Sequence, residues 1–306
     1  MKEKIGIPYM GSKRKLATKI LYKITQRHCG ITDFYDLFGG GGSISFTAIR
    51  DYRFNVHYNE LNKHIYSLVE YLKNNKELEP KFHEWVTREQ FFEQCAKTNE
   101  DADWYSGFVM SCWSFGNNQS SYIYGANIEK FKRLAHQFIV FGCLDSMIEL
   151  GVVIPEILQF KNIEKRRVLF CKEIEKILSN RFDIQNLERL QNLERIQNLE
   201  RLQNLQITNK SYENVIIKGE NPVIYCDIPY KGTGEYKEGG FDHERFYQWA
   251  NDIDYPVYIS EYDAPFEKIE TFKHRSSLSP TKNKKKTFES IFWNGKGEIN
   301  KSTLFQ

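Results

Sequence analysis

The feature that most constrains the fold is a glycine loop placed directly after a strand. Residues 31–38 (ITDFYDLF) form an apolar run of strand length, and four glycines follow at 39–42. Beyond them the apolar spacing predicts a helix, a second strand and a second helix, at 44–52, 54–58 and 62–74. This order predicts the start of a doubly wound α/β sheet.

The same alternation returns in the last third of the chain. Strands are predicted at 212–217, 222–227, 256–260 and 287–293, and a helix at 242–252. A basic loop is predicted at 273–286. Residues 79–150 look mostly helical and are broken at 114–121 by a segment typical of an exposed loop or hairpin. We therefore expect a sheet whose two halves are separated by a helical insertion.

Composition excludes several classes of protein. With 41% hydrophobic and 15% aromatic residues, the 306-residue chain is expected to fold rather than to be disordered. Lys plus Arg (43) nearly balances Asp plus Glu (40), so any nucleic-acid contact must be local. No apolar run approaches the roughly 20 residues of a membrane helix. None of the six cysteines forms a C-x-x-C pair, which predicts reduced, mostly buried thiols in a cytoplasmic protein.

Residues 184–205 repeat a six-residue unit (IQNLER, LQNLER, IQNLER, LQNL) with an apolar residue at every third position. On an α-helix this spacing turns by about −60° per step, so the eight apolar side chains would spiral around the helix. Such a spiral forms neither a straight seam nor a heptad coiled coil. We predict a surface protrusion from which one unit can be removed. A dimerisation device is the alternative.

The glycine loop and an acidic residue beyond it indicate a nucleoside-containing cofactor. Glycines without Cβ atoms let the backbone approach a ligand at the end of the first strand. Glu60 lies eighteen residues after Gly42, at the end of the second strand, where an acid typically binds ribose hydroxyls. The G-x-G-x-x-G spacing of dinucleotide enzymes is not met. Residues 6–13 (GIPYMGSK) also fail the phosphate-loop pattern, which excludes a nucleoside triphosphatase.

Residues 225–230 (YCDIPY) carry the most informative chemistry. An apolar strand ends there in an acid, a proline turn and an aromatic ring. A carboxylate and a backbone carbonyl accept the two N–H bonds of an exocyclic amine, and a ring stacks on a planar base. A strand-ending turn with a packing tyrosine is the alternative interpretation of this segment alone.

Taken in order, four motifs resemble the Dam-like class of DNA adenine-N6 methyltransferases. They are YMGSK (9–13), DLFGGGGS (36–43), Asn59-Glu60 and Asp227-Ile228-Pro229-Tyr230. The closing segments Tyr258–Ser260 and Glu289–Asn294 are also similar to that family. The resemblance covers about 1–75 and 205–295. The family's usual D-P-P-Y is D-I-P-Y here, and Ile228 retains the carbonyl that the middle residue contributes.

The resemblance implies a fold and a division into domains. The fold is α/β, a Rossmann-like S-adenosylmethionine methyltransferase sheet with an inserted, mainly helical target recognition domain. The expected catalytic domain comprises 1–75 and 206–306, the recognition domain 76–183, and the repeat protrusion 184–205.

The resemblance also implies S-adenosylmethionine as cofactor, with no metal. Tyr9 and Lys13 would lie by the cofactor, Asp36 by its amino-acid portion, and Glu60 on its ribose hydroxyls. The other implied cofactor-binding residues are Phe38, Gly40, Gly42, Ser211, Tyr212 and Asp227.

The implied activity is transfer of the methyl group to an adenine flipped out of double-stranded DNA. Tyr230 would stack on the base, while Asp227 and the Ile228 carbonyl bind its amine and Pro229 shapes the turn. Methylation of cytosine N4 and a catalytically inactive DNA-binding protein are the alternatives. The family context implies a prokaryotic or phage-infected cell, with a cognate restriction enzyme as a possible partner, and we expect a monomer.

Two segments are predicted to contact DNA. Asn117, Asn118 and Gln119 carry amide side chains suited to paired bonds with adenine edges in the major groove. A simple turn is the alternative for this Gly-Asn-rich stretch. Lys282, Lys284, Lys285 and Lys286 are predicted to bind phosphates.

Overall fold

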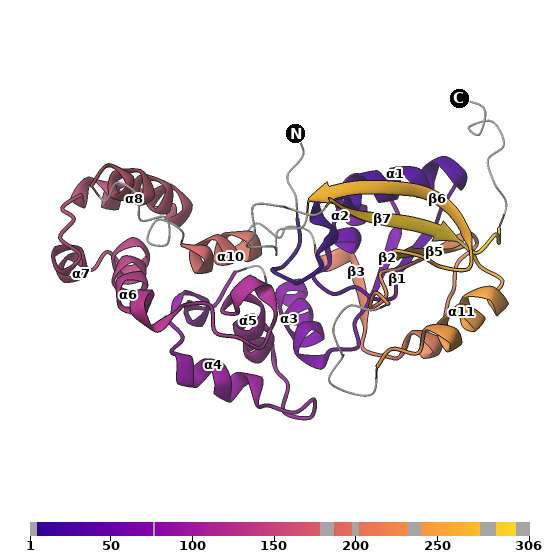
Figure 1. Ribbon diagram of the computed structural model, residues 1–306, viewed down its shortest axis with the longest axis horizontal. Helices are drawn as coiled ribbons and strands as arrows, with labels where there is room; N and C mark the ends of the chain where they lie inside the picture. Colours follow the sequence, from indigo (N-terminus) through magenta and orange to yellow (C-terminus); the bar gives the residue numbers. More distant parts are fainter. Residues whose placement is uncertain are drawn as a thin grey trace.

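The computed structural model describes residues 5–75, 77–177, 187–197, 202–231, 240–275 and 286–297. Its centre is a seven-stranded sheet in the order β3-β2-β1-β4-β5-β7-β6 (Figure 1). β3, β2, β1, β4 and β5 run parallel, and β7 lies antiparallel between β5 and β6. The carboxyl ends of β1, β2 and β4 therefore meet at one edge, where a doubly wound sheet binds its ligand.

The strands of the sheet differ in burial, and β1, β4 and β5 are buried along their whole length, as expected where helices cover both faces. Their bounds are β1 Asp33–Asp36, β2 Asn55–Asn59, β3 Leu205–Thr208, β4 Pro222–Cys226, β5 Val257–Glu261, β6 Glu267–Arg275 and β7 Lys286–Trp293. Alternate residues of β1 point to opposite faces, Phe34 into one apolar cluster and Tyr35 into the other. The predicted α/β fold is confirmed.

Helices cover the two faces unequally. α1 (Ala17–Arg27), α2 (Ser43–Asp51) and α3 (Lys63–Asn74) pack on one face, and α11 (His243–Asp252) packs on the other. The carboxyl ends of β1 and β2 lead into α2 and α3 respectively, which brings the start of each helix to the ligand edge of the sheet (Figure 1).

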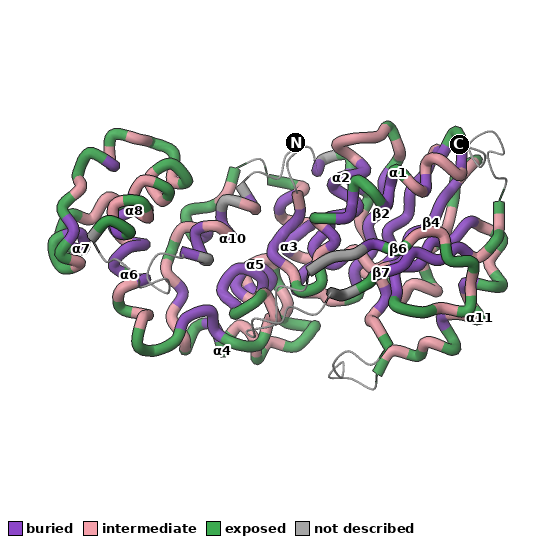
Figure 2. Tube along the Cα trace, turned by 45° about the horizontal axis from the view of Figure 1, so that its top comes forward, coloured by how far each residue is buried: buried purple, intermediate pink, exposed green. Residues whose placement is uncertain are grey.

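The insertion between β2 and β3 is helical and extends to one side of the sheet (Figure 1). Its helices are α4 Arg88–Cys95, α5 Trp104–Cys112, α6 Ala126–Phe141, α7 Leu144–Glu149, α8 Ile163–Ile177 and α10 Glu188–Gln197. α5 packs against α3 so closely that a Cβ on Gly107 would lie 2.1 Å from the His64 carbonyl oxygen. Its aromatic residues join the core of the sheet, whereas α6, α7 and α8 enclose a separate cluster. Figure 2 shows the buried residues running from the sheet through α5.

One of the sequence-based strand predictions is wrong, and two strands were not predicted. Residues 212–217 form a short 3₁₀ turn (Tyr212–Asn214) and an irregular segment, and the strand beside β2 is β3, seven residues earlier. Val215 and Ile217 pack on the α11 face instead of joining the sheet, whereas Ile216 between them is exposed. Their β-branched side chains therefore contribute to packing without forming a strand. β6 was not predicted, and residues 273–275 belong to it rather than to a loop.

The prediction that the repeat is a surface protrusion is also wrong for its described part. Leu187, Leu190, Leu193 and Ile196 are 0–2% exposed. Leu187 and Leu190 join the cluster of α6, α7 and α8, whereas Leu193 and Ile196 join the core of the sheet. The spiral of apolar residues is the physical reason, because it turns successive side chains of one helix toward two different neighbours. α10 therefore connects the two cores.

Candidate active site

The glycine loop lies at the carboxyl end of β1 and is held from both sides. Gly40 and Gly42 have positive φ angles of 46° and 69°, which side chains with a Cβ rarely adopt. A Cβ on Gly40 would lie 2.9 Å from the Tyr9 ring, so Tyr9 packs directly on the loop. The Ile7 amide donates to the Gly41 carbonyl oxygen (2.9 Å), which brings the YMGSK segment beside the loop.

Glu60 lies at the end of β2 beside the glycine loop. Its Oε2 accepts from the Gly40 amide at 2.6 Å, and its Oε1 accepts from the Asn62 amide at 2.8 Å. Its side chain is 8% exposed, and burial raises the pKa of the carboxyl. Each carboxylate oxygen retains a lone pair beyond these bonds, as binding of a hydroxyl pair requires.

The other residues predicted for the cofactor are a buried acid, Asp36, and an aromatic pair, Phe38 and Tyr212, with Ser211 beside it. The buried Asp36 carboxylate accepts from the Ser45 hydroxyl (2.7 Å), and burial raises the pKa of Asp36 to about 7. Phe38 stacks against Tyr212 with ring centroids 5.5 Å apart, next to the first residues of α11. Ser211 precedes the 3₁₀ turn that carries this ring. Phe38 and Tyr212 thus form an aromatic wall at the ligand edge, close to the glycine loop.

The Asp227–Tyr230 segment follows β4 directly and is anchored by its neighbours. His243, the first residue of α11, lies with its Nε2 2.8 Å from the Pro229 carbonyl oxygen. The Lys231 amide donates to the buried Glu261 carboxylate at the end of β5 (3.1 Å). The turn is therefore held on both sides, which orients the Asp227 carboxylate and the Tyr230 ring.

A buried lysine links this segment to the YMGSK motif. Lys13 Nζ lies 2.7 Å from Asp227 Oδ1, 3.4 Å from Glu289 Oε1 and 4.8 Å from the centroid of the Tyr230 ring. Burial and the nearby Glu289 raise the pKa of Asp227, Lys13 opposes them, and the result is a pKa of about 6. The Lys13 pKa is lowered by burial, but Asp227 and Glu289 outweigh that effect and raise it.

The break predicted in the insertion is a small hairpin. Ser114 and Tyr122 pair as an antiparallel bridge, and the tip is a 3₁₀ turn at Phe115–Asn117. Asn118 Oδ1 accepts from the amides of residues 120 and 121, so this side chain shapes the turn. Gln119 Oε1 accepts from the Asn62 side chain at 3.4 Å, which places the hairpin beside the end of β2. Asn117 and Gln119 both have positive φ angles.

The predicted basic loop falls mainly outside the described residues. Lys282, Lys284 and Lys285 lie outside them, and Lys286 begins β7, where its backbone pairs with Arg275. Within the described part of the chain, no helix is long and apolar enough to cross a membrane. The described residues also contain no group of three or more His, Cys, Asp or Glu side chains able to hold a metal ion.

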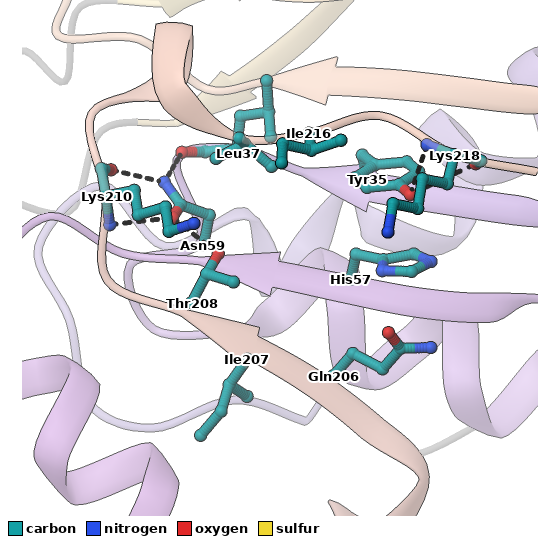
Figure 3. Close-up of a pocket in the computed structure, with 11 residues that line it drawn as sticks. Tyr35, Leu37, His57, Asn59, Gln206, Ile207, Thr208, Lys210, Ile216 and Lys218 are labelled. Carbon is teal, nitrogen blue, oxygen red and sulfur yellow. Dashed lines mark hydrogen bonds between the residues drawn. The ribbon is translucent and has the colours of Figure 1, made fainter.

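A cavity of about 220 Å³ lies over β1, β2 and β3 on the α11 side of the sheet (Figure 3). It is lined by Tyr35, Leu37, His57, Asn59, Gln206, Ile207, Thr208, Lys210, Val215, Ile216 and Lys218. Within it, the Asn59 side-chain amide donates to the carbonyls of Leu37 and Lys210, at 3.0 and 2.9 Å. Asn59 thus joins the loops after β1 and β3, and none of the predicted site residues lines this cavity.

Residues 9–130 match the family model described as D12 class N6 adenine-specific DNA methyltransferase. Over these residues the chain is similar to that methyltransferase family. The match confirms, for this part of the chain, the resemblance drawn from the motifs. It includes the glycine loop, Glu60 and the hairpin, and it ends before the Asp227–Tyr230 segment. No curated protein matches the sequence.

The sequence analysis did not identify three residues of this candidate site. Glu289 belongs to a predicted strand, and nothing in the sequence marks its proximity to Lys13. His243 and Glu261 anchor the turn from α11 and β5. Since Glu261 follows a predicted strand at the ligand edge of the sheet, its position is a signal that could have found it.

Proposed function

We propose that this protein transfers a methyl group from S-adenosylmethionine to the N6 amine of adenine at specific sites in double-stranded DNA. One observation carries the proposal. The Asp227 carboxylate and the Tyr230 ring stand together at the end of β4, on the same sheet edge as the glycine loop and Glu60. An acceptor for an amine and a platform for a planar base are thus next to a site suited to a nucleoside.

The residues at the end of β1 and β2 fit S-adenosylmethionine. Glu60 would hold the ribose hydroxyls, while Phe38, Tyr212 and Ser211 would lie along the nucleoside. Tyr9, Asp36, Gly40 and Gly42 would line its remaining length. When bound, this cofactor supplies a methyl group already activated on a sulfonium.

The chain itself contributes binding and orientation. Asp227 and the Ile228 carbonyl would accept the two N–H bonds of the target amine, which orients the nitrogen lone pair. Pro229 restricts the turn, and Tyr230 would stack on the flipped base. Such positioning accounts for most of the rate gain expected here, since the methyl group needs no further activation.

The helical insertion is proposed to read the DNA sequence through its hairpin. The contact between Gln119 and Asn62 supports this, because it places the hairpin beside the ligand edge of the sheet. Asn117 and Gln119 would reach base edges, and Asn118 would hold the turn that presents them. The lysines around 282–286 would bind phosphates.

The test uses purified protein, labelled S-adenosylmethionine and unmethylated genomic DNA. Digestion to nucleosides and mass spectrometry should reveal N6-methyladenine. N4-methylcytosine would instead establish the cytosine alternative, and cofactor binding without any methylated base would establish an inactive binder. Methylation-sensitive sequencing of the same DNA would give the recognition site.

The salt dependence of DNA binding tests the proposed lysine contacts, and the choice of methylated sites tests the proposed hairpin contacts. Changing Lys282, Lys284, Lys285 and Lys286 to alanine should reduce the salt dependence of binding by up to about four phosphate contacts on every duplex. Changing Asn117 or Gln119 to alanine should alter the methylated sites, or lower discrimination by about 1–3 kcal/mol per contact. An unchanged salt slope contradicts the first proposal, and an unchanged methylome contradicts the second.

A further inference from the structure

Glu289 is a second buried carboxylate at the methyltransferase site. It lies on β7, 4% exposed, and its Oε1 is 3.4 Å from Lys13 Nζ. β7 is antiparallel to β5, and Ser290, the next residue, pairs with Glu261 at the end of that strand. Glu289 therefore faces the site from a different side of the sheet edge than Asp227, and the proposed reaction gives it no role.

The Lys13 ammonium occupies the place that the proposed reaction gives to the target amine. It is 2.7 Å from the Asp227 carboxylate and 4.8 Å from the centroid of the Tyr230 ring. Hydrogen bonding to Asp227 and contact with Tyr230 are the two contacts assigned above to the base. Because two nitrogen donors cannot fill one position, Lys13 must leave Asp227 before the base can enter.

A lysine that leaves its partner inside a protein needs another acceptor. Lys13 is 6% exposed, so its ammonium cannot move into water without opening the surrounding structure. A buried charge that loses its partner is strongly destabilising. Beyond Asp227, the Glu289 carboxylate and the Gly11 carbonyl oxygen (3.3 Å) already lie near Nζ, and only Glu289 carries a compensating charge.

We propose that Glu289 is a positioning residue of the methyltransferase, which holds Lys13 once the target amine has displaced it from Asp227. This inference rests on the proposed function. It gives the site two arrangements, one with Lys13 on Asp227 and one with Lys13 on Glu289. In the second arrangement Asp227 is available to the amine while Lys13 remains paired.

The charges around Lys13 provide a readout that a purely structural role would not change. Tyr225, Asp227 and Tyr230 face the cluster from β4 and its loop, Glu289 from β7, Glu261 from β5 and Asp36 from β1. The negative charge of Glu289 raises the pKa of Asp227. Replacing Glu289 with glutamine should therefore lower the pKa of Asp227. Since the pH profile of kcat/KM reports the groups of the free enzyme, its acid limb should shift to lower pH.

The experiment measures kcat/KM for methylation of unmethylated genomic DNA from pH 5 to 9. For Glu289→Gln we expect a plateau about 10- to 100-fold below that of the wild type, because Lys13 stays on Asp227, together with the shifted acid limb. Glu289→Asp keeps the charge but shortens the side chain, so it should show an intermediate plateau and the wild-type limb. Ser290→Ala is the matched control on β7, since its hydroxyl contacts Thr271 (3.0 Å), and it should behave as wild type.

Each outcome decides between the two proposals. An active wild type with an unchanged Glu289→Gln plateau, or with a lower plateau and an unmoved limb, overturns the role of Glu289 and leaves the proposed function standing. A wild type that forms no N6-methyladenine overturns both. If thermal melts show that Glu289→Gln does not fold, Glu289→Asp decides, because a full wild-type plateau in that variant overturns the inference.

Discussion

Leu193→Ala tests whether the repeat is part of the core. Leu193 is 0% exposed and lies in the cluster that includes the face of the sheet covered by α1, α2 and α3. The substitution removes three buried heavy atoms from a helix that cannot readily move into the space. Asn192 donates to the Cys112 carbonyl oxygen (3.0 Å), and Arg189 donates to that of Phe82.

Leucine-to-alanine changes in protein cores cost about 2–5 kcal/mol, with the larger values where the site cannot collapse. Because the hydrogen bonds of Asn192 and Arg189 hold α10 in place, we expect a cost in the upper part of this range. The free energy of unfolding should fall by about 3–5 kcal/mol. For a chain of this size that corresponds to a decrease in Tm of about 5–8 °C. Urea titration followed by circular dichroism measures the first quantity, and a thermal melt measures the second.

Ile148→Ala is the matched control for this experiment. Ile148 is 65% exposed on α7, so its truncation should change stability by no more than about 0.5 kcal/mol. If Leu193→Ala also costs less than about 1 kcal/mol, α10 is not part of the core and the reasoning from burial fails.

Four further predictions follow from the site and the repeat. Deleting 190–195 should abolish cooperative melting, since the deletion removes Leu190 and Leu193 and turns the rest of α10 by about 120°. A melt like that of the wild type would restore the hypothesis that the repeat is a surface protrusion. Asp227→Ala should slow methyl transfer at least about 100-fold and leave calorimetric S-adenosylmethionine binding nearly intact, and near-wild-type turnover would contradict its role. Glu60→Ala should weaken S-adenosylmethionine binding by about 1.5–3 kcal/mol, and Glu60→Gln should weaken it less, because the glutamine amide keeps one acceptor for Gly40. Equal affinity in the wild type and both variants would remove Glu60 from the site. Methyl transfer should fall as the pH drops below about 6, since burial and Glu289 raise the pKa of Asp227 to about that value and its protonation removes an acceptor for the amine; a rate that stays level to pH 5 would refute this.

The sequence by itself determined the parts of this protein that depend on neighbouring residues. The strand at 31–38, the glycine loop, and the acid at position 60 are local patterns with a direct structural meaning, and each appears in the structure close to its predicted place. The hairpin at 114–121 and α11 were found in the same way, from turn residues and helical spacing. The Asp227–Tyr230 segment was also predicted to follow a strand directly, and it does so at the end of β4. Its chemistry stays a prediction from the succession of an acid, a proline turn and an aromatic ring.

Only the tertiary structure decided what depends on partners distant in the sequence. Val215 and Ile217 lie in a segment with the composition of a strand but pack on the α11 face, and β3 begins at Leu205, the last residue assigned to the repeat. The repeat shows the reason most clearly. Its apolar residues spiral around the helix and share no single face, so they can all be buried only because two separate cores lie on either side of α10. Lys13 and Glu289 come together only because β7 inserts next to β5, so no local pattern could reveal their ion pair.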